Sequence, residues 1–186
     1  GLVTYGAHSG AERISAIAGE LGYRAVLIGI WNPQDGTEVE NALLAWKENP
    51  DLVVGVSLGN EIVFAERDDW SGLTSAVTRL HARAPALPVT VSEPFSNYLD
   101  DAGAAALLAE LDFLAVNIHP AFEPWFQDAP PFNWADFVVK VSGRLADEAF
   151  CGPVFVKATG LASAPADAGF TPERQATFAP DRRRPG

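Results

Sequence analysis

One apolar run ends on a carboxylate: Val53-Val54-Gly55-Val56-Ser57-Leu58-Gly59-Asn60-Glu61. A continuous apolar run of this length is typical of a strand covered on both faces, as in a parallel sheet. A carboxyl group placed where such a strand opens into a loop is held rigidly and partly desolvated, which suits it to general acid chemistry. Glu61 is therefore the first candidate catalytic residue. The alternative is a Glu that only caps a helix or forms a salt bridge in a loop.

Five further apolar runs alternate with segments of helical periodicity, which is the pattern of an α/β fold with a parallel sheet. The six expected strands are Leu2 to Gly6, Ala25 to Trp31, Val53 to Glu61, Pro88 to Pro94, Phe113 to Pro120 and Pro153 to Gly160. The expected helices are one that starts near Ser9 and stops at Gly22, then Val39 to Lys47, Trp70 to Ala84, Asp101 to Leu111, Trp134 to Ala149, and one that starts at Thr171.

Every expected strand ends in polar or aromatic side chains: Tyr5, Trp31, Asn60 with Glu61, Glu93, Asn117 with His119, and Lys157 with Thr159. No glycine-rich phosphate loop follows the first strand, so a dinucleotide-binding sheet would lack its mechanism. Functional groups that converge at strand carboxyl ends are how (β/α) barrels build active sites. The sequence predicts a TIM-barrel-type α/β domain over residues 1–178, followed by a flexible tail over 179–186.

Composition and net charge limit the classes of partner that the chain is expected to bind. The chain has 186 residues, 48% of them hydrophobic, which is enough for one core and one domain. A formal charge of −11 argues against nucleic acid or an anionic membrane as partner, whereas a neutral ligand is compatible. With one Cys and three His at no ligand spacing, we expect neither a disulfide nor a metal nor a cofactor. The compartment is not readable, and secretion or the periplasm is compatible.

Four segments carry a resemblance to a known enzyme family. They are Val54 to Glu61, Val-Ser-Glu-Pro-Phe at 91–95, Ala-Val-Asn-Ile-His-Pro-Ala-Phe at 115–122, and Pro-Val-Phe-Val-Lys-Ala-Thr-Gly at 153–160. Together they resemble glycoside hydrolase family 17, which comprises retaining β-1,3-glucanases, related β-1,3-1,4-glucanases and bacterial glucan transglycosylases on a TIM barrel. The resemblance spans Gly1 to about Phe178. It implies that Asn60 contacts the sugar and that Glu61 is the acid/base at the end of barrel strand four.

The nucleophile position departs from the family's pattern. The family carries a Glu-Thr-Gly segment at the end of strand seven, and this chain has Ala158-Thr159-Gly160 there. A methyl group cannot attack an anomeric carbon, and retaining hydrolysis needs a second carboxylate about 5 to 5.5 Å from the first. The resemblance thus implies a form that does not turn over. Ala158 is either an engineered substitution or that of a natural non-hydrolytic relative, and its otherwise intact surroundings favour the first.

The strand count is a second departure. Glu61 ends the third expected strand and Ala158 the sixth, a separation that matches strands four and seven of an eight-stranded barrel. The chain would then hold strands two to seven and lack the first and the last. Because open parallel edges expose unpaired backbone, we expect them to be covered by the tail, by a differently closed sheet or by a second copy in a homodimer.

Aromatic residues at or beyond the strand ends are candidate walls for glucose units: Trp31, Phe122, Trp125 and Phe126. The candidate polar substrate contacts are Tyr5, Glu93, Asn117 and His119, each of which could equally form a structural hydrogen bond. Trp46, Trp70 and Trp134 lie in expected helices and are interpreted as structural.

Three readings stay open. The leading one is a family 17-like hydrolase scaffold that acts on a β-1,3-glucan oligosaccharide or polysaccharide, with Glu61 as acid/base and Ala158 in the nucleophile position. The second is a non-catalytic β-glucan-binding protein, and the third is a fragment without a competent site. Chain-length preference, endo or exo action, and hydrolysis against transglycosylation depend on loop shapes that the sequence does not reveal.

Overall fold

The computed structural model describes residues 1–8, 10–128 and 132–178. All six expected strands are present in one sheet: β1 Leu2–Val3, β2 Val26–Ile30, β3 Val53–Asn60, β4 Val89–Pro94, β5 Leu114–Asn117 and β6 Val154–Ala158. Each strand pairs in parallel with its neighbour in sequence, so the order is β1-β2-β3-β4-β5-β6. The predicted parallel α/β architecture is confirmed.

Helices connect the strands. They are α1 Ile14–Glu20, α2 Gly36–Glu48, α3 Trp70–Arg83, α4 Phe95–Asp100, α5 Ala105–Leu108, α6 Phe132–Arg144 and α7 Pro172–Phe178, with a π turn at Leu145–Ala149. The helix expected from Asp101 to Leu111 is broken up, because Asp101 is extended and its side chain caps a short 3-10 turn that leads into α5. The preceding helix α4 was not predicted. Pro172 opens α7, as expected for a proline in the first turn.

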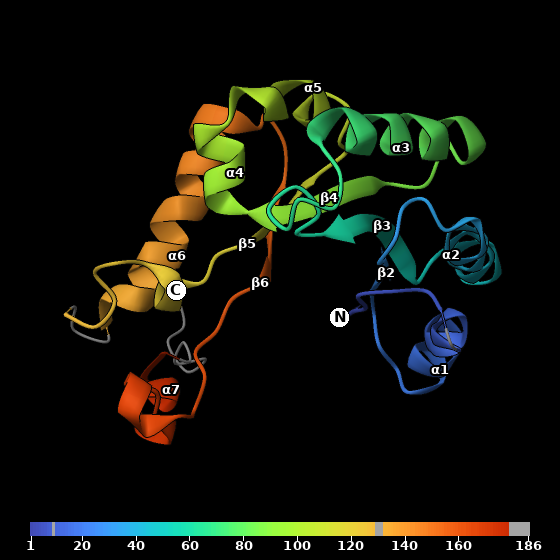
Figure 1. Ribbon diagram of the computed structural model, residues 1–186. Helices are drawn as coiled ribbons and strands as arrows, with labels where there is room; N and C mark the ends of the chain where they lie inside the picture. The colour runs from blue at the N-terminus through green and yellow to red at the C-terminus, as the bar shows by residue number, and fades with distance from the viewer. Residues whose placement is uncertain (9, 129–131, 179–186) are drawn as a thin grey trace.

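The sheet curls into a half-barrel with α1 to α6 along its outer side, and α7 lies beyond β6 (Figure 1). The main core fills the space between sheet and helices, where Ile28, Val56, Leu73, Leu114 and Leu145 are fully buried. Within the described residues β1 pairs only with β2 and β6 only with β5, so the sheet does not close on itself. Whether two strands of an eight-stranded barrel are missing stays a prediction.

The three tryptophans that were interpreted as structural do pack in or against the hydrophobic cores. Trp70 and Trp134 are buried, and Trp46 packs half-buried against the main core.

None of the described helices has the length and apolar content of a membrane span. The described His, Cys, Asp and Glu side chains form no group of three that could hold a metal ion. The predicted tail lies outside the described residues.

Candidate active site

A bulge at the end of β3 sets the position of Asn60 and Glu61. Ser57 pairs with Thr90 and Asn60 with Ser92, so three steps along β3 match two steps along β4. Gly59 adopts a φ of 79°, and a Cβ there would collide with Ile62. The glycine is therefore required by the turn and by the closeness of Ile62. The bulge turns the end of the strand, which is how bulges re-aim side chains beside active sites.

Asn117 joins the two candidate residues of β3 to β5. Its Nδ2 donates to Glu61 Oε1 at 2.8 Å and to Asn60 Oδ1 at 3.1 Å, while its Oδ1 accepts from Ser92 Oγ at 2.9 Å. The Asn117 side chain is almost fully buried, whereas Glu61 and Asn60 are half-buried. Every polar atom of the Asn117 amide is thus engaged, and it holds Glu61 in one orientation at the carboxyl end of the sheet. Glu61 itself has a φ of 53°, an uncommon conformation for a non-glycine residue.

A second bulge lies across the sheet, in β6. Val116 pairs with Val156 and Asn117 with Ala158, so Lys157 is the extra residue and both Lys157 and Ala158 stand opposite Asn117. Lys157 Nζ donates to Asn60 Oδ1 at 2.9 Å and lies 4.5 Å from the centre of the Tyr5 ring. Strands β1, β3, β5 and β6 therefore bring Tyr5, Asn60, Glu61, Asn117 and Ala158 into one neighbourhood. The sequence did not single out Lys157 as part of this site.

Glu93 is buried near the end of β4, next to the loop that follows Glu61. Its side chain has no exposed surface, and its carboxylate accepts the backbone N–H groups of Ile62, Val63 and Phe64 at 2.6, 3.1 and 3.1 Å. Burial raises the pKa of Glu93 and outweighs these hydrogen bonds, which lower it. Both carboxylate oxygens of Glu93 accept N–H groups of the loop after Glu61, and the side chain is fully buried, so Glu93 offers no contact to a sugar. This geometry suits a residue that positions the loop.

Glu38 is a comparable residue that the sequence reasoning missed. It is buried, and its carboxylate accepts the N–H groups of Ala7, Trp31 and Asn32 at 2.8, 2.8 and 2.9 Å. It thereby joins the loops after β1 and β2. The pattern Asp35-x-x-Glu38 at the start of α2 was a detectable signal, since Asp35 is the N-cap and a glutamate at the third helical position often completes a capping box. Here Glu38 turns to the strand ends instead.

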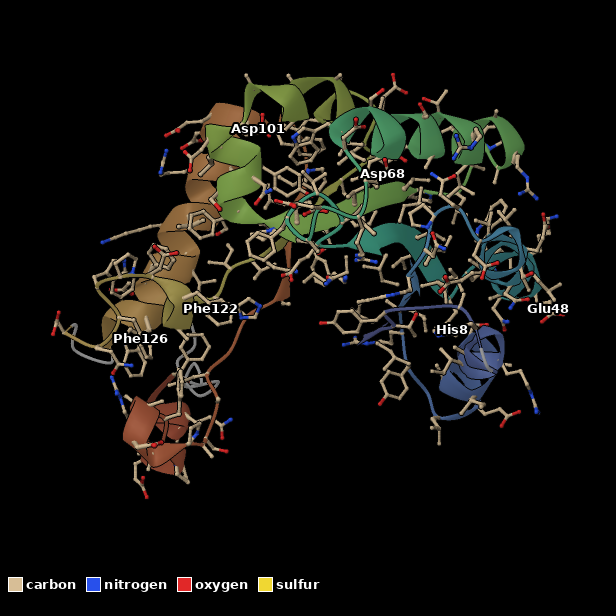
Figure 2. All side chains as sticks on the ribbon, viewed as in Figure 1. His8, Glu48, Asp68, Asp101, Phe122 and Phe126 are labelled. Atoms are coloured by element: carbon tan, nitrogen blue, oxygen red, sulfur yellow. The ribbon has the colours of Figure 1, made fainter. Side chains whose placement is uncertain are left out.

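Two of the predicted aromatic walls are exposed near the site. Trp31 is 44% exposed, and the Arg67 guanidinium lies 4.5 Å from the centre of its ring. Phe122 is 82% exposed and stands 5.5 Å from the ring of His119. Burial lowers the pKa of His119, while the nearby charge of Glu61 opposes that shift. His119 and Phe122 thus extend the site along the segment that follows β5, where Figure 2 labels Phe122.

Phe126 is not a wall, and that prediction is wrong. It is 1% exposed and packs at 4.6 Å from the ring of Trp134 in a second core, which also contains Leu161. Trp125 is half-buried, with its ring centre 5.0 Å from that of Phe137 on α6. Phe122 and Phe126 lie on the same segment between β5 and α6 (Figure 2), yet only the first faces solvent. Phe126 is buried because it belongs to this small second core, against which Phe178 of α7 also packs.

The sequence matches no protein-family model and no curated protein. The fold, however, is similar to those of solved enzymes. An endo-laminarinase from Formosa Hel1_33_131 superposes with a TM-score of 0.75 and 18% identity, over 95% of this chain and 63% of that one. A glycoside hydrolase family 17 β-1,3-glucanosyltransferase from Rhizomucor miehei gives 0.69 and 19% over 90% and 63%. An active-site mutant of the Rhizomucor enzyme in complex with laminaritriose gives the same values.

These likenesses concern the fold, because the identities are low. They show that this chain shares the fold of these enzymes over 90 to 95% of its length. The chain spans 63% of the length of each of these proteins.

Proposed function

We propose that this chain is a β-1,3-glucan-binding glycoside hydrolase scaffold in which Glu61 is the acid/base and Ala158 occupies the nucleophile position. The observation that carries the proposal is the cluster at the carboxyl ends of β3, β5 and β6. There Asn117 holds the Glu61 carboxylate and the Asn60 amide, and Ala158 pairs with Asn117. A retaining site needs an acid on one side of the anomeric carbon and a carboxylate on the other, and only the acid is present.

The exposed aromatic rings support a sugar as ligand. Tyr5, Trp31 and Phe122 are each more than 40% exposed and come from strand ends around Glu61. Such rings pack on the apolar faces of glucose units, while the amide of Asn60 can bind a hydroxyl group. A neutral glucan also suits a chain of formal charge −11. Ala158 favours a second candidate function, in which the cleft binds β-glucan without any reaction.

A glycosyl fluoride separates the two candidates. With α-laminaribiosyl fluoride as donor and a β-glucoside as acceptor, we expect the chain to accumulate a longer β-1,3-linked oligosaccharide. The acceptor oxygen bonds to the anomeric carbon, fluoride leaves, and ionised Glu61 takes the acceptor's proton. Chromatography of the products and fluoride release measure the coupling. Product accumulates because Ala158 cannot form the glycosyl-enzyme intermediate needed for hydrolysis.

The matched control is Glu61→Gln, which keeps the size of the side chain and removes the base. It should lower the coupling rate by about 10²-fold or more. Formate or azide, which fit the space beside Ala158, should also rescue some turnover of an activated β-glucoside. If laminaritriose binds but neither coupling nor rescue occurs, the chain is the non-catalytic glucan-binding protein. If laminaritriose does not bind either, both candidate functions fail.

We further propose that a second copy of the chain covers the open edges of the sheet. The unpaired sides of β1 and β6 flank a hollow of about 650 Å³ at the amino ends of the strands, lined by Leu2, Val54, Phe113 and Phe155 among others. Val54 and Phe155 are 49% and 40% exposed. Such edges and apolar surface favour association. Sedimentation should show a dimer that Phe155→Lys weakens by at least tenfold in Kd, whereas a wild-type monomer at all concentrations would refute the proposal.

A further inference from the structure

The ammonium group of Lys157 is a half-buried positive charge without an ion-pair partner among the described residues. The four described ion pairs, with N···O separations up to 4.0 Å, do not include it. Its hydrogen bond goes to the neutral amide oxygen of Asn60, and that same oxygen also accepts from Asn117. An ammonium has three N–H donors, so two of them have no acceptor in the described structure.

The surroundings only partly compensate this charge. Burial lowers the pKa of Lys157 to about 8, although the charges of Glu61 and Glu93 both raise it. Glu61 is held by Asn117, and Glu93 is occupied by the backbone of the loop after Glu61. The Tyr5 ring adds a cation–π contact, which is weaker than an ion pair. A negative group from outside the chain would stabilise the charged form of this half-buried ammonium.

The residue next to Lys157 is small and half-exposed. Lys157 and Ala158 share the bulge opposite Asn117, and Ala158 presents only a methyl group. A ligand carboxylate placed beside Ala158 would meet the Lys157 ammonium and receive charge-assisted hydrogen bonds, which are stronger than those between neutral groups. We propose that Lys157, together with the space beside Ala158, forms a carboxylate-binding site at the carboxyl end of the sheet.

The carboxylate can come from two sources, a small free acid or a sugar acid whose ring packs on the aromatic side chains. The site goes beyond the proposed glucan function, because a neutral glucan offers Lys157 no charge. Both sources share the same recognition, in which one ammonium binds an anionic carboxylate.

The test titrates three probes into the full chain at constant ionic strength: acetate, methyl β-D-glucuronide and the uncharged methyl β-D-glucoside. Backbone amide NMR shifts of residues 157–159 report binding. We expect saturable shifts with at least one carboxylate, and at least tenfold weaker binding of the glucoside. Equal affinities for acetate and glucuronide indicate a site for small free acids, whereas a glucuronide preference of tenfold or more indicates a sugar acid.

Two variants locate the effect. Lys157→Met keeps the length of the side chain and should lower carboxylate affinity at least tenfold, while Lys140→Met, on the exposed side of α6, should not change it. Because Lys157→Met removes a poorly paired buried charge, it should stay folded, which its thermal unfolding checks. Affinity in the wild type should fall as the pH rises through about 8. Glu61, Glu93 and Tyr5 are the described titratable groups that face Lys157, and all three follow or end other strands.

The outcomes are decisive. Absence of saturable binding for both carboxylates, glucoside binding as tight as that of the tighter carboxylate, or full carboxylate affinity in Lys157→Met would each overturn the proposed site. Laminaritriose serves as the separate probe of the glucan function. If laminaritriose fails to bind while a carboxylate binds through Lys157, the glucan proposal fails and the carboxylate site stands.

Discussion

Ala158→Glu is expected to give the chain measurable hydrolysis of laminarin. The new carboxylate would supply the missing nucleophile at the end of β6, opposite Asn117 and across from Glu61. Lys157 in the same bulge would hold that carboxylate ionised, because a neighbouring ammonium favours the charged form of an acid. Release of reducing sugar from laminarin measures the activity.

Two variants show whether the activity is that of a retaining pair. Ala158→Gln has nearly the shape of the glutamate but no nucleophilic oxygen, so it should be inactive. Glu61→Gln in the Ala158→Glu background should lower the rate by about 10² to 10⁴-fold, the usual contribution of a general acid. If Ala158→Glu has the circular dichroism and Tm of the wild type yet hydrolyses no more laminarin than Ala158→Gln, the assignment of β6 as the nucleophile strand is wrong.

Glu93→Ala is expected to have the largest effect on stability. It removes the carboxylate that accepts three backbone N–H groups in the described structure. Ile62 is buried, so its N–H group would lose its partner, whereas the N–H groups of Val63 and Phe64 can be partly rehydrated. The expected cost is about 2 to 4 kcal/mol, since an unsatisfied buried donor costs roughly 1 to 3 kcal/mol and a cavity adds to it. For a chain of this size the Tm should fall by roughly 6 to 12 °C.

The exposed Glu110 provides the control, because Glu110→Ala touches no such hydrogen bonds and should leave the Tm nearly unchanged. The loop after Glu61 should loosen in Glu93→Ala, so hydrogen exchange at Ile62 to Phe64 should accelerate more than exchange in α3. A Tm within about 2 °C of the wild type would contradict the positioning role of Glu93.

The pH dependence of stability in the wild type and in Glu93→Gln tests the direction of the Glu93 pKa shift. Burial raises the pKa of Glu93 above its ordinary 4.5, so the folded state takes up this proton more readily than the unfolded state. Its contribution to stability is then fully present below pH 4.5 and is lost as the pH rises through the folded value. Relative to Glu93→Gln, the wild type should lose stability over that range. The opposite trend would mean that the three hydrogen bonds outweigh burial.

The six strands could be predicted from the sequence because each is a short apolar run with its own turn residues. The same holds for the position of Glu61 and Asn60 at a strand end, since strand carboxyl ends meet at one edge of a parallel sheet. Helix α4 was missed because Phe95–Asp100 is too short to show a helical period. The helix expected after it was misjudged because Asp101 caps a separate turn.

The candidate site was harder to predict than the fold. Glu93 and Phe126 both look like functional residues in the sequence, but Glu93 accepts backbone N–H groups of a loop thirty residues away and Phe126 packs in a second core. For the same reason Glu38 was overlooked, and Lys157 was named only as a polar residue at a strand end. Their partners, such as Ala7 and Asn60, come from distant segments of the chain, and no local pattern indicates which segments will meet.

The sequence by itself determined the parallel α/β order and the polar strand ends, because apolar periodicity and strand length are local properties. Only the tertiary structure decided which polar groups meet. The two bulges, at Ser57 to Asn60 and at Lys157, exist only once β3 lies beside β4 and β6 beside β5. A shift of one residue in such a pairing turns side chains to the other face, so the meeting of Lys157, Asn60 and Glu61 is a property of the assembled sheet.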